Sequence, residues 1–146
     1  MNIEMLANLK NASALDSDDD FRTYTETCSE IRRSADRPPL PKLLECLNDK
    51  EGGEIQYELI ELCESYPDDD YCESLMVFCE DGYFRSPFWF DLMFCSMLNS
   101  QNLFDRILAL AKNNHFATRK IEELVSNDEV DPEFSAQWKE ARQPWH

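Results

Sequence analysis

The sequence predicts an all-α protein, because helical periodicity recurs along the chain and strand signals are nearly absent. We find no run of alternating β-branched residues, which would indicate half-buried strands. Apolar residues recur instead at spacings of three and four, and prolines, glycines and capping residues separate these segments. The two signals together divide the chain into short helices joined by brief links.

The strongest helix is predicted before Pro67. Gly52 and Gly53 mark its start, and Pro67 ends it because the proline ring cannot continue the helical hydrogen-bond ladder. Its apolar face has residues at i, i+4, i+7, i+8 and i+11, namely Ile55, Leu59, Leu62, Cys63 and Tyr66. A second helix should begin within a few residues, with Asp68 or Asp69 as its cap, and end near Gly82. Its buried stripe is Tyr71, Leu75, Phe78 and Cys79.

A third helix opens at Ser86 and Pro87, a hydroxyl cap followed by a proline in the first turn, and runs to Leu98. Apolar residues cover nearly its whole circumference, so we expect it to be the central and most buried element. Asn99 and Ser100 break it. The stripe of a fourth helix follows, with Leu103, Phe104, Ile107, Leu108 and Leu110 or Ala111.

Weaker patterns predict five more helices, near residues 2–14, 19–35, 40–49, 115–126 and 132–142, with prolines marking several starts (Pro38, Pro39, Pro41, Pro132). Short helices that are joined by short links pack as antiparallel neighbours. A row of such antiparallel helical hairpins is a HEAT-like, right-handed stack. A compact helical bundle is the alternative, because no convincing repeat of roughly 34 to 47 residues is present.

Composition indicates a folded acidic domain. The 146 residues carry 30 acidic and 14 basic side chains, a net charge of -16, and 42% hydrophobic residues, which is enough to fill a core. This length suits one domain, residues 1–146. The negative charge argues against direct binding of nucleic acid or anionic membranes, whose phosphates would repel it. We expect a basic protein partner.

The chain is expected to be a soluble, cytoplasmic protein. Its first ten residues lack the cationic start and apolar centre of a signal peptide. The most apolar stretch, residues 84–98, is interrupted by polar residues and is shorter than the roughly 20 residues of a bilayer span. Without an export signal the six cysteines should be reduced, mostly as small core residues: Cys28, Cys46, Cys63, Cys72, Cys79 and Cys95.

Most of the negative charge lies in one quarter of the sequence. Residues 45–81 hold 13 acidic side chains and one basic side chain, Lys50, which accounts for 12 of the 16 surplus negative charges. Glu54, Glu58 and Glu61 place like charges three and four residues apart on one helix, at a cost of about 0.2 to 0.5 kcal/mol per pair. One interpretation of this pattern is a solvated face that keeps the protein soluble. The other, which its one-sidedness favours, is a docking face.

A second acidic cluster, Asp16 to Asp20, fails the test for a calcium loop. Counting from Asp16 places Phe21 where an EF-hand loop needs glycine, and Thr27 where it needs a bidentate glutamate. The same count from Asp68 fails as well. Capping of the following helix explains Asp18 and its neighbours. We therefore expect no metal site.

Signals for catalysis are thin. The chain has two histidines, His115 and His146, so a cysteine–histidine pair would have to use His115. Cys72 and Cys79 are two helical turns apart and look like core positions rather than zinc ligands. No nucleotide-binding glycine motif and no metalloprotease motif is present. We expect no cofactor and no enzymatic activity.

The segment from Gln56 to Asn99 resembles the bacterial polymorphic-toxin proteins called immunity protein 30. The matching pattern is an aromatic residue before a Leu-Ile helix with a glutamate, a Tyr-Pro stop, an acidic pair and tyrosine, a Pro-x-Trp motif and a closing Leu-Asn. The residues that match it are Tyr57, Leu59, Ile60, Glu64, Tyr66, Pro67, Asp69, Asp70, Tyr71, Leu75, Pro87, Trp89, Leu98 and Asn99. One departure is that the arginine common before Leu-Asn is absent here, where Cys95, Ser96 and Met97 stand.

The resemblance implies a protein that binds and neutralises a cognate toxin inside the producing cell. An acidic helical face could fill the basic cleft of a toxin that acts on nucleic acid or nucleotides. The expected contact residues are Glu58, Glu61, Glu64, Asp68, Asp69, Asp70 and Glu73, with Tyr66, Tyr71 and Tyr83 as candidate aromatic anchors. Two alternatives are an acidic chaperone or adaptor for a secreted effector and a DNA-mimic inhibitor of a nucleic-acid-binding protein.

Overall fold

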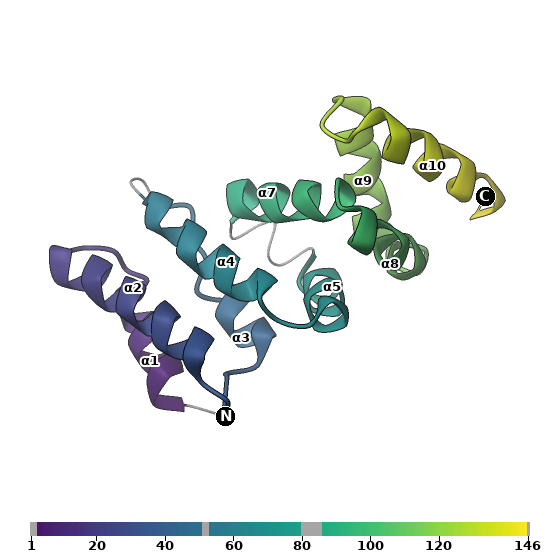
Figure 1. Cartoon of the computed structure of the whole chain (residues 1–146). Coiled ribbons are helices and arrows are strands. Elements are labelled where there is room, and N and C mark those ends of the chain that lie inside the picture. Colours follow the sequence, from purple (N-terminus) through teal and green to yellow (C-terminus); the bar gives the residue numbers. More distant parts are fainter. Residues whose placement is uncertain (1–2, 51–52, 80–85, 146) are drawn as a thin grey trace.

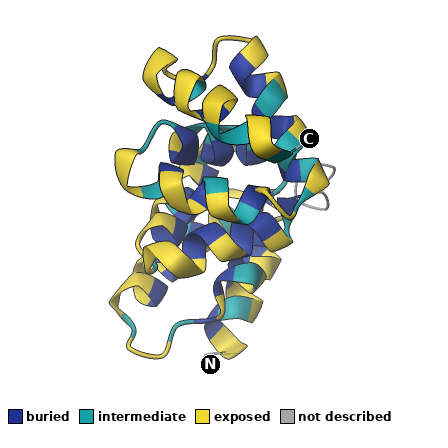
Figure 2. Ribbon diagram, turned by 90° about the vertical axis from the view of Figure 1, so that its right-hand side faces the viewer, coloured by how far each residue is buried: buried dark blue, intermediate teal, exposed yellow. Residues whose placement is uncertain are grey.

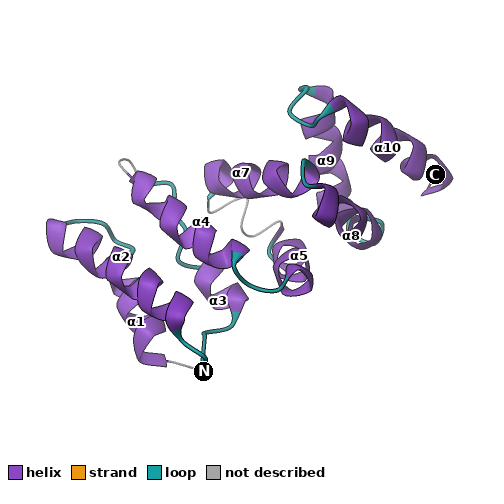
Figure 3. Ribbon diagram, viewed as in Figure 1, coloured by secondary structure: helices purple, strands orange, loops and turns teal. Residues whose placement is uncertain are grey.

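The computed structural model describes residues 3–50, 53–79 and 86–145, and these residues form helices joined by loops, with no strand among them (Figure 3). The all-α prediction is confirmed. The first half contains α1 (Ile3–Ala12), α2 (Asp18–Arg33), α3 (Leu40–Leu44), the 3-10 turn η1 (Gly53–Gln56), α4 (Tyr57–Glu64) and α5 (Asp68–Val77). The second half contains α7 (Pro87–Leu98), α8 (Gln101–Ala111), α9 (His115–Ser126), α10 (Pro132–Arg142) and the 3-10 turn η2 (Gln143–Trp145).

The helices form an elongated array in chain order (Figure 1). The α1–α2 pair lies at one end and the α9–α10 pair at the other, and each hairpin packs on the next through α2 against α4, α3 against α5, and α5 against α8. Near the C-terminal end, α8 lies at the centre of the packing and contacts α5, α7, α9 and α10. This arrangement is a stack of helical hairpins rather than helices gathered around one axis.

One hydrophobic core runs through the whole array, from Met5 in α1 to Trp138 in α10. The buried residues lie on the inner sides of the helices and the exposed residues on the outer sides (Figure 2). The expectation that α7 is buried on nearly all sides needs a correction. Most of its apolar residues are buried, but the Phe88 side chain is 59% exposed.

Two of the differences from the predicted helix ends are large. The helix expected over 40–49 ends at Leu44, because the next backbone bonds tighten to the i to i−3 spacing and Asn48 turns away to bond Gln56. The helix expected to end near Gly82 ends at Val77, and Gly82 lies outside the described residues. By contrast, α9 and α10 have the expected bounds.

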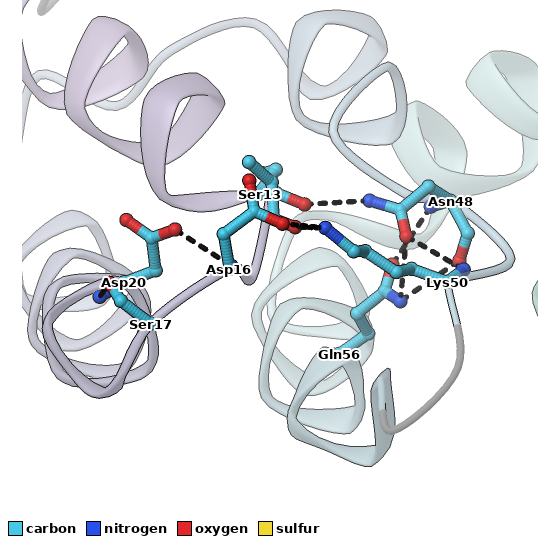
Figure 4. A network of polar contacts seen from close by, with 8 residues as sticks. Ser13, Asp16, Ser17, Asp20, Asn48, Lys50 and Gln56 are labelled. Carbon is cyan, nitrogen blue, oxygen red and sulfur yellow. Dashed lines mark hydrogen bonds and ion pairs between the residues drawn. The ribbon is translucent and has the colours of Figure 1, made fainter.

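A polar network joins the α1–α2 turn to the loop before α4 (Figure 4). The fully buried Gln56 side chain accepts a hydrogen bond from the Asn48 backbone N–H at 2.8 Å and donates to the Asn48 carbonyl at 2.9 Å. The Asn48 amide donates in turn to the Ser13 carbonyl at 2.8 Å. The Lys50 ammonium donates to the Ala14 carbonyl and pairs with Asp16. These bonds fix the start of α4.

The acidic cluster at Asp16 to Asp20 has a structural role at the start of α2. The Ser17 hydroxyl, rather than Asp18, is the N-cap, because it accepts the Asp20 backbone N–H at 3.2 Å. The Asp20 carboxylate accepts the Asp16 backbone N–H at 2.9 Å. The carboxylates of Asp18, Asp19 and Asp20 lie in the first turn, where the helix dipole favours negative charge.

The substitution Gln56→Ala should lower the free energy of unfolding by about 1 to 3 kcal/mol, because the part-buried backbone N–H and carbonyl of Asn48 lose their hydrogen bonds to the buried Gln56 side chain. Urea unfolding measures this loss, with Gln101→Ala on the exposed side of α8 as the control. Equal stability of the two variants would contradict a structural role for the network.

Candidate functional site

The candidate site is the outer side of two consecutive helices. We use the term α4–α5 acidic surface for Glu58, Glu61, Glu64, Asp68, Asp69, Asp70 and Glu73. Six of these seven side chains are exposed, and the seventh, Glu58, is half-buried. Four of them lie on α5 and three on α4, and the two helices are linked by Ser65, Tyr66 and Pro67. The structure therefore places the whole predicted set of carboxylates at the protein surface.

Glu58 and Glu64 are the two carboxylates of α4 that lie closest to the core. Burial first, and then the negative charge of Glu58, raises the pKa of the Cys28 thiol to about 12. Partial burial, followed by repulsion from Glu61, raises the pKa of Glu64 above its usual value. The folded protein therefore disfavours the charged form of Glu64 on α4.

The aspartates that open α5 are bound from a helix that the sequence prediction did not connect with them. Asp68 or Asp69 was expected to cap the helix, but the N-cap position is Pro67, without a side-chain capping bond, and both aspartates lie inside the first helical turn. Arg106 of α8 lies 2.9 Å from the Asp69 carboxylate and 3.9 Å from that of Asp68. The pair ties α5 to α8 and neutralises part of the surface.

Asp70 and Glu73 are the carboxylates of α5 with the clearest access to a partner. Both side chains are exposed, and no ion pair of either is recorded among the residues that the structure describes. They are one turn apart on the same helix. Their charges are thus available to a partner without breaking a contact of the described structure.

The three tyrosines expected as anchors have different positions. The Tyr66 hydroxyl donates to the Pro38 carbonyl at 2.7 Å, and the Arg37 guanidinium lies 5.1 Å from its ring centre, so this half-buried side chain already joins α4 to the α2–α3 link. Tyr71 is only 3% exposed, and burial followed by the charge of Glu64 raises its pKa. Tyr83 lies outside the described residues.

The closing Leu-Asn motif also has a structural position. The Asn99 amide donates to the Glu129 carbonyl at 3.2 Å, and its oxygen accepts the Asp131 backbone N–H at 2.8 Å. These bonds attach the α7–α8 turn to the α9–α10 turn. The sequence pattern identified Asn99 as a helix end but gave no sign of its partners 30 residues away.

The candidate catalytic residues are not assembled into a site in the described structure. His115 is exposed at the start of α9. Burial raises the pKa of Cys72 and Cys95 to about 11 each, away from the thiolate form that a nucleophile needs. Among residues 3–50, 53–79 and 86–145, no group of three potential ligands could hold a metal ion. In the same ranges no helix is long and apolar enough to cross a membrane.

The fold and the exposed carboxylates define an acidic, all-α protein built from stacked helical hairpins. The chain belongs to the Immunity protein 30 family, whose model matches residues 11–107, about two thirds of its length. Comparison with curated proteins and with solved structures gives no match. The family makes this chain an immunity protein against a toxin. The matched residues include all of α2 to α7, and with them the α4–α5 acidic surface.

The raised pKa of Glu64 gives a prediction for stability against pH. A raised pKa means that folding disfavours the charged form of Glu64, so its charge lowers the free energy of unfolding at neutral pH. This loss of stability disappears as the pH falls, first through the raised pKa of the folded state and then to the ordinary pKa of the unfolded state. The substitution Glu64→Gln should therefore raise the free energy of unfolding at pH 7, by about 0.2 to 0.5 kcal/mol.

Urea unfolding of wild type and Glu64→Gln at a series of pH values from 7 down to about 4 measures this difference. The difference in free energy of unfolding between Glu64→Gln and wild type should shrink as the pH falls. Glu73→Gln, which removes one charge from the exposed side of α5, controls for the net charge. A gain from Glu64→Gln that does not change with pH would contradict the assignment.

Proposed function

We propose that this immunity protein acts in the cytoplasm of the cell that makes it, by binding its cognate toxin directly. The α4–α5 acidic surface covers a basic active site or substrate cleft of the toxin, so that substrate no longer reaches it. The protein contributes binding alone, with no reaction and no cofactor of its own. A basic cleft is the expected feature of toxins whose substrates are nucleic acids or nucleotides.

The observation that carries this proposal is the exposure of six carboxylates within the short segment from Glu61 to Glu73. Carboxylates with a purely structural role would be expected to pair with bases of neighbouring helices, as Asp69 does with Arg106. Asp70 and Glu73 face solvent, and the 13 acids of residues 45–81 have a single base among them in the sequence. A basic partner would supply the missing positive charge.

The arrangement also suits fast capture of a harmful partner. A surface of one charge sign steers an oppositely charged protein, and such association reaches about 10⁸ M⁻¹s⁻¹ or more at low salt. Screening over a distance of about 10 Å at 0.1 M salt weakens this attraction. A strong salt dependence of the association rate is therefore part of the proposal.

Removal of the two exposed charges of α5 tests the surface. The double variant Asp70→Asn/Glu73→Gln should slow association with the cognate toxin domain about tenfold at low salt, and by less at 0.5 M salt. Surface plasmon resonance with a catalytically inactive toxin measures both rates. The substitutions leave the Asp68 and Asp69 contacts with Arg106 in place.

The matched control is Glu133→Gln/Glu140→Gln, which removes two exposed carboxylates from α10, beyond the residues that match the family. This control should bind as wild type does. An equal loss in both double variants would mean that only net charge matters, and would contradict a docking role for this surface. A bound toxin that stays fully active would favour a chaperone or adaptor.

A further inference from the structure

Two large aromatic side chains at the edge of the acidic surface are open to solvent. Tyr57, the first residue of α4, is 45% exposed, and Phe88, in the first turn of α7, is 59% exposed. Aromatic side chains of this size bury large apolar areas and dominate the energetics of interfaces. Their exposure is therefore an observation that the stability of the fold does not explain.

Both rings rest on the same buried residue. Trp89 is only 4% exposed, and its ring centre lies 4.9 Å from that of Tyr57 and 4.9 Å from that of Phe88. The interplanar angles are 87° and 82°, so both contacts are edge to face. The indole joins the start of α4 to the start of α7, two helices that lie next to each other in Figure 1.

This support prepares the two rings for binding. A partner that contacts them has little side-chain freedom to remove, because each ring already has a fixed neighbour. Tyrosine is enriched among the residues that carry most of the energy of interfaces, and such residues cluster in small central patches. Tyr57 and Phe88 together have the character of an anchor.

Carboxylates lie close to the rings along the chain. Glu54 and Glu61 are exposed one turn before and one turn after Tyr57. Burial raises the pKa of Asp49, and the backbone N–H of Phe88 acts on this carboxylate in the opposite direction. Lys50 is the only base in residues 45–81, and its ammonium pairs with Asp16. The described residues next to the rings along the chain thus include the two carboxylates Glu54 and Glu61.

We propose that Tyr57 and Phe88 are the anchor with which this immunity protein holds its toxin. The toxin surface that fits them has an apolar or arginine-lined recess bordered by lysine or arginine. An arginine guanidinium would stack on the exposed rings while its neighbours pair with Glu54, Glu61 and Asp49. The inference rests on the proposed function and names the part of the surface that holds the partner once charge has brought it near.

The test is calorimetric titration of the full chain with a catalytically inactive form of the cognate toxin domain. Tyr57→Ala and Phe88→Ala should each raise the dissociation constant at least about 30-fold, chiefly through faster dissociation. Tyr57→Phe keeps the ring and should bind as wild type does. Phe88→Lys places a positive charge against a basic partner and should weaken binding as well.

The matched control is Ile3→Ala. It removes an apolar side chain of α1 that is 68% exposed and lies outside the α4–α5 acidic surface, and it should change the dissociation constant less than about threefold. Circular dichroism and thermal unfolding confirm that each variant is folded. If the wild type binds and the two alanine variants bind equally well, the anchor is refuted and the proposed function stands.

Two other outcomes overturn the proposal. If the wild-type chain does not bind the toxin domain, the proposed function and the anchor fall together. If light scattering shows a wild-type dimer that Phe88→Ala converts to a monomer, the rings are the contact between two copies of this chain.

Discussion

The structure depends on the mutual burial of apolar helix faces. Its α-helices have between 5 and 16 residues in the described part of the chain, and isolated helices below about 12 to 15 residues are marginal in water. None of the short ones is stable without a neighbour that covers its apolar stripe. The continuous core from Met5 to Trp138 provides those neighbours in series. Because this core stabilises the helices, their solvent-exposed faces need not do so. These faces can therefore carry like charges that would destabilise an isolated helix.

Local signals predicted the helices well where a cap or a proline defines an end. The start of α10 follows from Pro132. At the start of α9 the structure adds a cap that the sequence analysis did not identify, because the Asn114 side chain accepts the Ala117 N–H at 3.0 Å. The sequence could not place the end of α3, because it depends on Gln56, eight residues beyond Asn48. Contacts of this kind belong to the tertiary structure and leave no periodic pattern.

In the candidate site, too, local sequence signals could be predicted and tertiary contacts could not. The charge count predicted seven contact carboxylates on two helices, and six of them are exposed on α4 and α5, because a helix with acids on its polar face exposes them. It could not show that Arg106 contacts two of these acids, since the helix that carries Arg106 is placed by packing. Nor could it select the exposed aromatic residues. In a helix that is apolar on nearly all sides, such as α7, only the neighbouring helices decide that Phe88 faces solvent and Trp89 the core.

The bonds of Asn99 have a consequence for where this protein can be divided. The family match ends at residue 107, inside α8, yet Asn99 is bound to Glu129 and Asp131, and the Phe104 ring lies 4.9 Å from that of Phe134. A chain cut at the edge of the match would expose one side of α8 to water. We therefore expect that the matched segment does not fold stably without the residues that follow it. The C-terminal hairpin caps the end of the stack and covers its apolar side, as terminal repeats do in solenoid proteins.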